Sequence, residues 1–211
     1  MVLFFIVQYG ERRVTAKETE VRVRVGKLMP IIEFAALCGL FLFLSLRVVP
    51  DRVGIFLLFL LPIAFGLHVI EEFVYPGGFI SWDNIFRPKY THTPGSFYVK
   101  INVFPSVASF ALVLGAFDYA GKYSVPGIRG WFVFVIFVTW NAVFHVRGAI
   151  QTRTYSPGMV TGLLLCIPLT VVSCVHFKRS GVIGIPSLVL CATIALAIQP
   201  TLDLIKNRGL R

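Results

Sequence analysis

The sequence predicts an all-α protein, a bundle of about six helices that span a membrane. Of its 211 residues, 56% are hydrophobic and only 14% are charged, whereas soluble domains carry about 25% charged residues. The mean hydropathy is +0.80, and several apolar runs reach the roughly 20 residues that a helix needs to cross the hydrocarbon core. This composition excludes a soluble globular enzyme and a disordered chain. The four cysteines lie inside apolar runs, which argues against a secreted disulfide scaffold.

The chain divides into a basic amino-terminal segment, residues 1–27, and a transmembrane domain, residues 28–211. In the first segment, residues 19–25 alternate polar and apolar side chains, a pattern typical of a strand. Residues 2–9 can pair with this strand as a short hairpin, and a disordered basic tail is the alternative. Within the second segment, Gly, Pro and charged residues separate the apolar runs. We expect spans at about 28–49, 53–74, 97–120, 129–150, 157–177 and 182–203.

The distribution of basic residues predicts the orientation of these spans. With six spans, fourteen Lys and Arg lie on the side that holds both termini, and six lie on the other side. Positive residues are enriched in cytoplasmic loops, so we expect both termini in the cytoplasm. The net charge of +10 is then explained by topology and by anionic headgroups. No nucleic-acid-binding motif accompanies it, and we expect membrane lipids as partners, with no nucleic acid.

Two clusters of polar residues interrupt the apolar spans. His68, Glu71 and Glu72 share one helical face near the end of the second span, and Asn141 and His145 are four residues apart in the fourth. Ionisable residues inside a span cost roughly 2.5–3.5 kcal/mol each, which makes them functional candidates. Both histidines lie roughly 22–24 Å from the outer ends of their helices. We therefore predict that helices two and four pack with these histidines facing each other, in one polar cavity open to the cytoplasm.

Other residues at or near this depth are candidates for binding a substrate. The segment 76–96, between the second and third spans, is rich in aromatic residues and has Pro-Gly near both ends. It can serve as a movable lid or as a static aromatic anchor at the interface. The candidate substrate-binding residues are Trp82, Phe86, Lys100, Asn102, Trp140 and Tyr155.

The pattern His68-x-x-Glu71-Glu72 resembles the signature of the HXXEE-domain family of small integral membrane proteins. A second block is similar to the family's downstream pattern: Asn141-x-x-x-His145, then residues 155–158 (Tyr-Ser-Pro-Gly), Val160-Thr161 and a span that contains Pro168. The resemblance covers roughly residues 55–175. It implies a small multi-pass membrane protein and supplies no established reaction.

The residues of the two clusters suit two kinds of chemistry. His68, Glu72 and His145 form a set of two histidines and one carboxylate, which is suited to zinc or iron. In that case Glu71 and Asn141 would orient the ligands. Without a metal, two adjacent carboxylates in a low-dielectric cavity cannot both ionise cheaply, so one can act as a general acid or base. The cofactor is therefore zinc, iron or none.

We expect an enzyme that transforms a hydrophobic small molecule from the inner leaflet, such as a lipid, an isoprenoid or a prenylated compound. The reaction would be a cyclisation or isomerisation started by protonation, or a metal-assisted reaction. Of the two glutamates, we expect Glu72 to be the essential one, since it lies closest to the face of His68. Two alternatives belong to other classes: a small proton-coupled transporter and a non-catalytic membrane scaffold.

Overall fold

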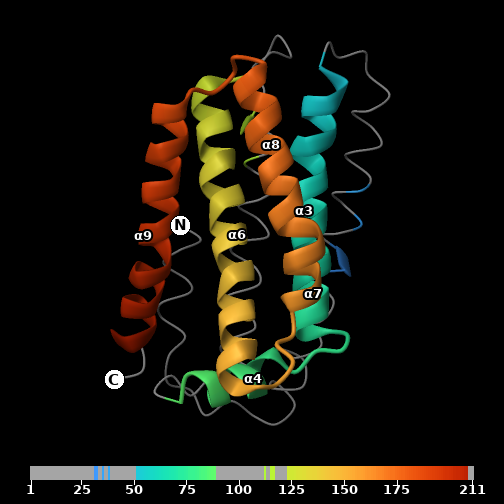
Figure 1. Ribbon diagram of the computed structural model, residues 1–211, viewed down its shortest axis with the longest axis vertical. Helices are drawn as coiled ribbons and strands as arrows, with labels where there is room; N and C mark the ends of the chain where they lie inside the picture. The colour runs from blue at the N-terminus through green and yellow to red at the C-terminus, as the bar shows by residue number, and fades with distance from the viewer. Residues whose placement is uncertain are drawn as a thin grey trace.

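The described part of the chain is a bundle of helices (Figure 1). The computed structural model describes residues 51–88 and 123–208, together with positions 31, 32, 35, 38, 112, 115 and 116; for residues 199 and 202–208 only the backbone is described. No strand is present among these residues, and the predicted hairpin lies outside them. The elements are α3 (Arg52–Phe73), α4 (Phe79–Phe86), α6 (Val125–Thr152), α7 (Met159–Thr161), a π-helix (Gly162–Cys166), α8 (Ile167–Arg179) and α9 (Ile185–Arg208).

Three helices in the described residues are long and apolar enough to cross a membrane. They are Arg52–Phe73, Val125–Thr152 and the continuous segment Met159–Arg179, which joins α7, the π-helix and α8. They confirm helical segments near the second, fourth and fifth predicted spans. A further helix, α9, occupies the sixth predicted span and contains a shorter apolar stretch, Ile185–Ile198. The predicted spans 28–49 and 97–120 lie almost entirely outside the described residues.

Polar side chains set where α3 and α6 begin. The Asp51 carboxylate caps α3 by accepting a hydrogen bond from the Gly54 N–H at 2.8 Å. Ser124 caps α6 in the same way, and Pro126 follows in the first turn, where its missing N–H has no consequence. As a result α6 begins four residues before the predicted span.

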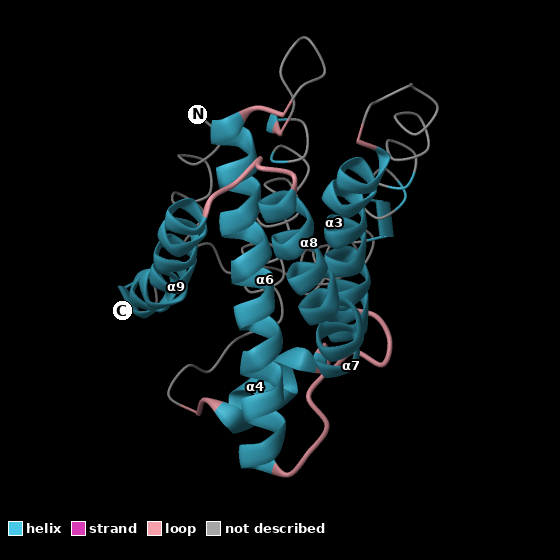
Figure 2. Cartoon of the chain, turned by 45° about the horizontal axis from the view of Figure 1, so that its top comes forward, coloured by secondary structure: helices cyan, strands magenta, loops and turns pink. Residues whose placement is uncertain are grey.

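The helices α3 and α6 run in the same direction, and α8 returns between them in the opposite direction (Figure 1). α9 lies on the other side of α6 (Figure 2). A buried aromatic and aliphatic core joins α3, α6 and α8, and in it Trp131 donates from Nε1 to the Leu58 carbonyl at 3.2 Å. This core fixes the position of α3 along α6. Because the two helices run in the same direction, their carboxyl-terminal ends lie at one end of the bundle.

The short helix α4 lies across that end (Figures 1 and 2). Phe79, Ile80, Trp82 and Asp83 are buried. The Trp82 ring lies against α6 where Gly148 leaves room for it: a Cβ added at Gly148 would lie 2.4 Å from the indole. The Asp83 carboxylate, fully buried, accepts two hydrogen bonds from Arg87, both at 2.8 Å. The first part of the predicted segment 76–96 thus packs as a cover over the end of α6.

Candidate functional site

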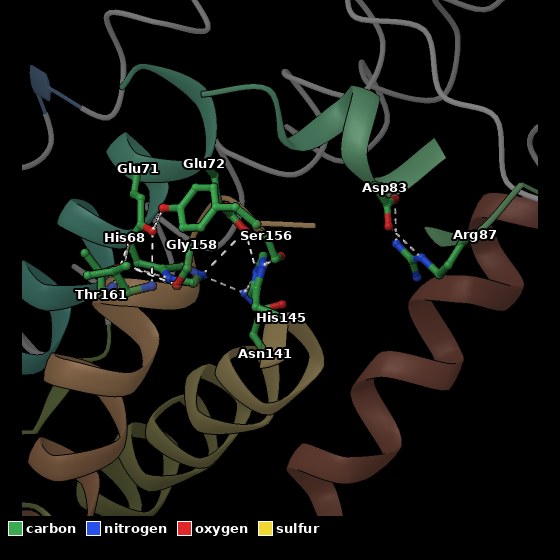
Figure 3. A network of polar contacts seen from close by, with 12 residues as sticks. His68, Glu71, Glu72, Asp83, Arg87, Asn141, His145, Ser156, Gly158 and Thr161 are labelled. Carbon is green, nitrogen blue, oxygen red and sulfur yellow. Dashed lines mark hydrogen bonds and ion pairs between the residues drawn. The ribbon is translucent and has the colours of Figure 1, made fainter. Parts of the chain in front are cut away.

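The polar residues of α3 and α6 meet at the end of the bundle that α4 covers (Figure 3). His68, Glu72 and His145 are all buried, with exposed fractions of 1%, 5% and 0% for the whole residues. The two imidazole rings lie edge to face with their centroids 5.0 Å apart. This confirms the prediction that helices two and four pack with these histidines facing each other.

The ring nitrogens of both histidines converge on the Glu72 carboxylate. Glu72 Oε1 lies 2.9 Å from His145 Nε2 and 3.5 Å from His68 Nε2. One ligand atom from each of the three residues falls within 4.8 Å of the others. Three groups that can exchange a proton or bind a cation therefore share one small volume.

Asn141 lies in contact with His68. Its Nδ2 atom is 2.9 Å from His68 Nε2, within hydrogen-bond distance. On the other side of the ring, His68 Nδ1 lies 3.1 Å from the Thr161 hydroxyl, which donates its own proton to Glu71. The Asn141 Nδ2 atom also lies 3.4 Å from His145 Nε2, so the amide stands between the two rings.

Glu71 faces away from the two histidines and holds the start of α7. Its carboxylate accepts hydrogen bonds from the backbone N–H of Val160 at 3.1 Å and of Thr161 at 2.8 Å. It also accepts from the hydroxyls of Thr161 and Tyr155. Partial burial and the Glu71 carboxylate raise the pKa of the Tyr155 phenol. The two adjacent glutamates thus have different partners, as the rotation of 100° per residue predicts.

The loop between α6 and α7 supplies the remaining contacts. The Ser156 hydroxyl, fully buried, lies 2.8 Å from His145 Nδ1. Gly158 follows with φ of +100°, and a Cβ at this position would lie 2.7 Å from His68 Cε1 and 3.0 Å from His145 Cε1. Only glycine combines this backbone conformation with so close an approach. The loop therefore closes the site from the side of α7.

A π-helical turn follows α7 directly. Gly162–Cys166 form π-helix where the sequence would otherwise continue as α-helix, and Gly162 packs against Ala142 of α6. Such turns insert one extra residue into a helix and occur frequently at functional sites. Here the turn begins one residue after Thr161, so it sets the direction in which Thr161 faces relative to α8.

Aromatic side chains cover the site from α4 and α6. The Trp82 indole stacks on the His145 ring with centroids 5.7 Å apart and planes 22° from parallel, and Phe79 lies 5.5 Å from the same ring. Phe86 packs on Trp82 and on Phe144. The histidine is thereby shielded from water.

The structure brings the five predicted catalytic residues, His68, Glu71, Glu72, Asn141 and His145, into one hydrogen-bonded network with Tyr155. Trp82 and Phe86 lie over it. Trp140 is 43% exposed on α6 and stands apart from the network, while Lys100 and Asn102 lie outside the described residues. Sequence reasoning did not name Ser156, Gly158 and Thr161 as site residues. All three lie in the downstream block of the family resemblance, and this block is the signal that could have identified them.

A comparison with protein families identifies the family of the chain. Residues 59–173, more than half of the chain, match the model of a family described as "protein of unknown function with HXXEE motif". The chain belongs to this family. In this HXXEE protein the motif residues are His68, Glu71 and Glu72, and the matched segment also contains α6, the loop and the π-helix. No curated protein and no solved structure matches the chain.

Proposed function

We propose that this HXXEE protein is an integral membrane enzyme that transforms a hydrophobic substrate, such as a lipid, an isoprenoid or a prenylated compound. The observation that carries the proposal is the convergence of His68, Glu72 and His145, all buried, on one small volume. Burying such groups costs free energy unless they are paired. A membrane protein that retains them at the meeting point of two helices and a loop has a use for their chemistry.

Glu72 and His145 are the pair that we propose to move protons. Their closest atoms are 2.9 Å apart, so a proton can pass between carboxylate and imidazole without rearrangement. His68 Nε2 lies 3.5 Å from the same carboxylate oxygen, and Asn141 contacts His68 Nε2. Such a pair can protonate an alkene and recover the proton from the resulting cation, which is the requirement of a cyclisation or isomerisation. Metal-assisted chemistry is the second mechanism that the same residues support.

The proposed orientation places this site in the cytoplasmic leaflet. Six spans with both termini in the cytoplasm, as the basic residues predict, would put the end of the bundle that holds α4 on that side. The arrangement of α9 agrees, because it ends at the same end of the bundle as the site (Figure 1). A reporter that is active only in the cytoplasm, fused in turn to each terminus, should give a signal at both.

Transport is less well supported by the described residues. A proton pathway needs polar groups along its whole length. From His68 toward the amino-terminal end of α3, the buried face of the helix is apolar through Phe65, Leu61 and Leu58. The next polar side chain on this face of α3 is Asp51, at the opposite end of the helix, and the buried Thr170 and Ser173 of α8 carry hydroxyls without a titratable group. This distribution favours a reaction centre at one face of the membrane.

The test is a comparison of lipid extracts from cells that express wild-type protein or the variants Glu72→Gln and His145→Ala. His176→Ala is the control, because it removes a histidine with a carboxylate partner at the far end of the bundle. We expect an apolar product that accumulates in cells that express wild-type protein or the control. With Glu72→Gln its amount should fall about 10²–10⁴-fold, the loss typical of removing a general acid or base. Identical extracts from wild type and both site variants would contradict the proposal. Proton flux into liposomes that depends on Glu72 would favour a transporter instead.

A further inference from the structure

We propose that His68, Glu72, His145 and Asn141 bind one divalent transition-metal ion, zinc or iron(II), with the Asn141 carbonyl oxygen as the fourth ligand. The assignment rests on the proposed function for its chemical role, since it names the cofactor of that reaction centre. Three features of the site support it: the spacing of the four groups, the hydrogen bonds behind the histidines, and the negative charge of Glu72.

The spacing of the four groups is that of a tetrahedral centre. Metal–ligand bonds of about 2.0–2.1 Å place neighbouring ligand atoms of a tetrahedron about 3.3 Å apart. Glu72 Oε1 lies 3.5 Å from His68 Nε2 and 2.9 Å from His145 Nε2. The Asn141 amide nitrogen lies 2.9 Å and 3.4 Å from the same two atoms. Four of the six edges of a tetrahedron thus match to within about 0.4 Å, and the ligand atoms of His68, Glu72 and His145 all lie within 4.8 Å of one another.

Asn141 takes part through its carbonyl oxygen. Rotating the amide by 180° about its last side-chain bond exchanges nitrogen for oxygen at nearly the same position. With Nδ2 in that place, the amide donates to His68 Nε2; with Oδ1 there, an oxygen faces the point on which both Nε2 atoms and Glu72 converge. Oxygen is a normal ligand of zinc and iron(II) beside two imidazoles and a carboxylate.

The histidines are held as metal-binding histidines are. Such residues usually donate the N–H of the ring nitrogen that does not bind the metal to an oxygen, which fixes the ring and its tautomer. His68 Nδ1 donates to Thr161 Oγ1, and Thr161 in turn donates to Glu71. His145 Nδ1 lies 2.8 Å from Ser156 Oγ. Both Nε2 atoms are thereby directed at the centre, and Glu71 is a positioning residue that acts through Thr161.

Gly158 allows the loop to pack directly on the cluster. A Cβ here would lie within 3.0 Å of His68 Cε1, Glu72 Cγ and His145 Cε1 together. The absent Cβ therefore lets the loop backbone close the cluster against both rings. The Glu72 carboxylate then supplies the negative charge that a buried cation requires.

The test is the metal content of the detergent-purified protein, produced in medium that contains zinc and iron and isolated through a tag without histidines. Elemental analysis should find about one ion per chain in wild type, as a single mononuclear site requires. Glu72→Gln and His145→Ala should lose it, and His176→Ala should retain it. Glu71→Gln should bind zinc about 10–100-fold more weakly, the usual cost of losing a group that orients a ligand.

Two substitutions at Asn141 separate a ligand from a hydrogen-bond donor. Asn141→Asp offers an oxygen but has no N–H, so it should retain the ion if Asn141 is a ligand. Asn141→Leu, similar in size, should weaken binding at least tenfold. If Asn141 serves only to donate to His68, both variants should behave alike. That result would overturn the role of Asn141.

Failure of the metal site and failure of the enzyme give different results. Wild-type protein that contains less than about a tenth of an ion per chain, and takes up none from added zinc, would overturn the metal site. If the lipid product still depended on Glu72, the proposed enzyme would stand without a metal. One ion per chain with no product that depends on Glu72 would leave the metal site and overturn the enzyme.

Discussion

Glu71 and Glu72 are adjacent in the chain, yet their carboxylates have opposite surroundings. Glu71 accepts hydrogen bonds from four donors on Tyr155, Val160 and Thr161. Glu72 faces the imidazoles of His68 and His145. The rotation between two adjacent helical residues therefore separates a carboxylate that binds the backbone N–H groups of α7 from one that faces two imidazoles.

This difference predicts which glutamine variant loses stability. Glu71→Gln places an N–H₂ group against N–H and O–H donors, so some of them lose their acceptor, at a cost of about 1–3 kcal/mol. Glu72→Gln keeps an oxygen for His145 and should change stability little. Thermal unfolding in detergent should show a midpoint lower by about 2–10 °C for Glu71→Gln. An equal or larger loss for Glu72→Gln would contradict the assignment.

Gly158 offers a second test at the scale of one residue. Gly158→Ala and Gly181→Ala both put a side chain at positive φ, +100° and +72°, but only at Gly158 does the new Cβ meet other atoms. The two variants share the backbone strain of about 1–2 kcal/mol. Gly158→Ala should lose about 1–3 kcal/mol more through overpacking. Equal unfolding midpoints for the two variants would show that the loop does not lie against the histidines.

At the scale of elements, α4 is fastened by a buried ion pair. Asp83 is fully buried and Arg87 binds it through two hydrogen bonds while lying 4.7 Å from the Phe144 ring centre. Arg87→Met removes the cation and leaves a buried carboxylate, which typically costs about 3–5 kcal/mol. The double variant Asp83→Leu/Arg87→Met should recover most of this loss. Unfolding midpoints that are additive in the double variant would contradict a direct pair.

The opposite end of the bundle is joined by a second polar contact, which predicts a dependence on pH. Asp51 accepts from Tyr123 at 2.9 Å and lies 3.0 Å from His176 Nε2, so it links α3, α6 and α8. Burial alone would raise the pKa of Asp51, but hydrogen bonds from Gly54, His176 and Tyr123 lower it below its ordinary value of 3.8. The ionised carboxylate therefore stabilises the fold above about pH 4, and this contribution is lost as the pH falls through the lowered pKa.

Asp51→Asn tests this contact while keeping the helix cap, because asparagine caps helices as well as aspartate does. The pair is partly exposed, so we expect a loss of at most about 1 kcal/mol at pH 7. The difference in unfolding midpoint between variant and wild type should shrink below pH 3.8. A difference that is the same at pH 7 and pH 3 would contradict the ionic contribution.

At high pH the same contact loses stability as the pH rises. Burial and Asp51 raise the pKa of Tyr123, so the contribution of its neutral hydroxyl to stability is lost above about pH 10.

Helical periodicity and depth in the membrane were enough to predict which polar residues meet. His68, Glu72, Asn141 and His145 lie on two helices of known direction, so spacing along each helix determines their level. The same periodicity places Trp140 about 100° away from Asn141, which accounts for its exposure. Ser156, Gly158 and Thr161 could not be placed in this way, because a loop has no period and its path depends on what it packs against. The start of α6 depends on the cap at Ser124, which hydropathy does not detect.

At the scale of the whole molecule, we expect that the polar cluster serves chemistry and that an apolar core could replace it without loss of folding. The direct test is the thermal unfolding midpoint of a variant in which the cluster is made apolar at similar volume. All polar partners are replaced together, so that none is left unpaired. The combined substitutions are His68→Leu, Glu72→Met, Asn141→Leu, His145→Leu and Ser156→Ala. Replacing buried ionic groups in this way is often neutral or stabilising by about 1–4 kcal/mol. We predict a midpoint equal to or above that of wild type. A midpoint lower by more than about 10 °C, equivalent to several kcal/mol for a chain of this size, would show that the cluster is a structural element of the fold and would contradict the claim.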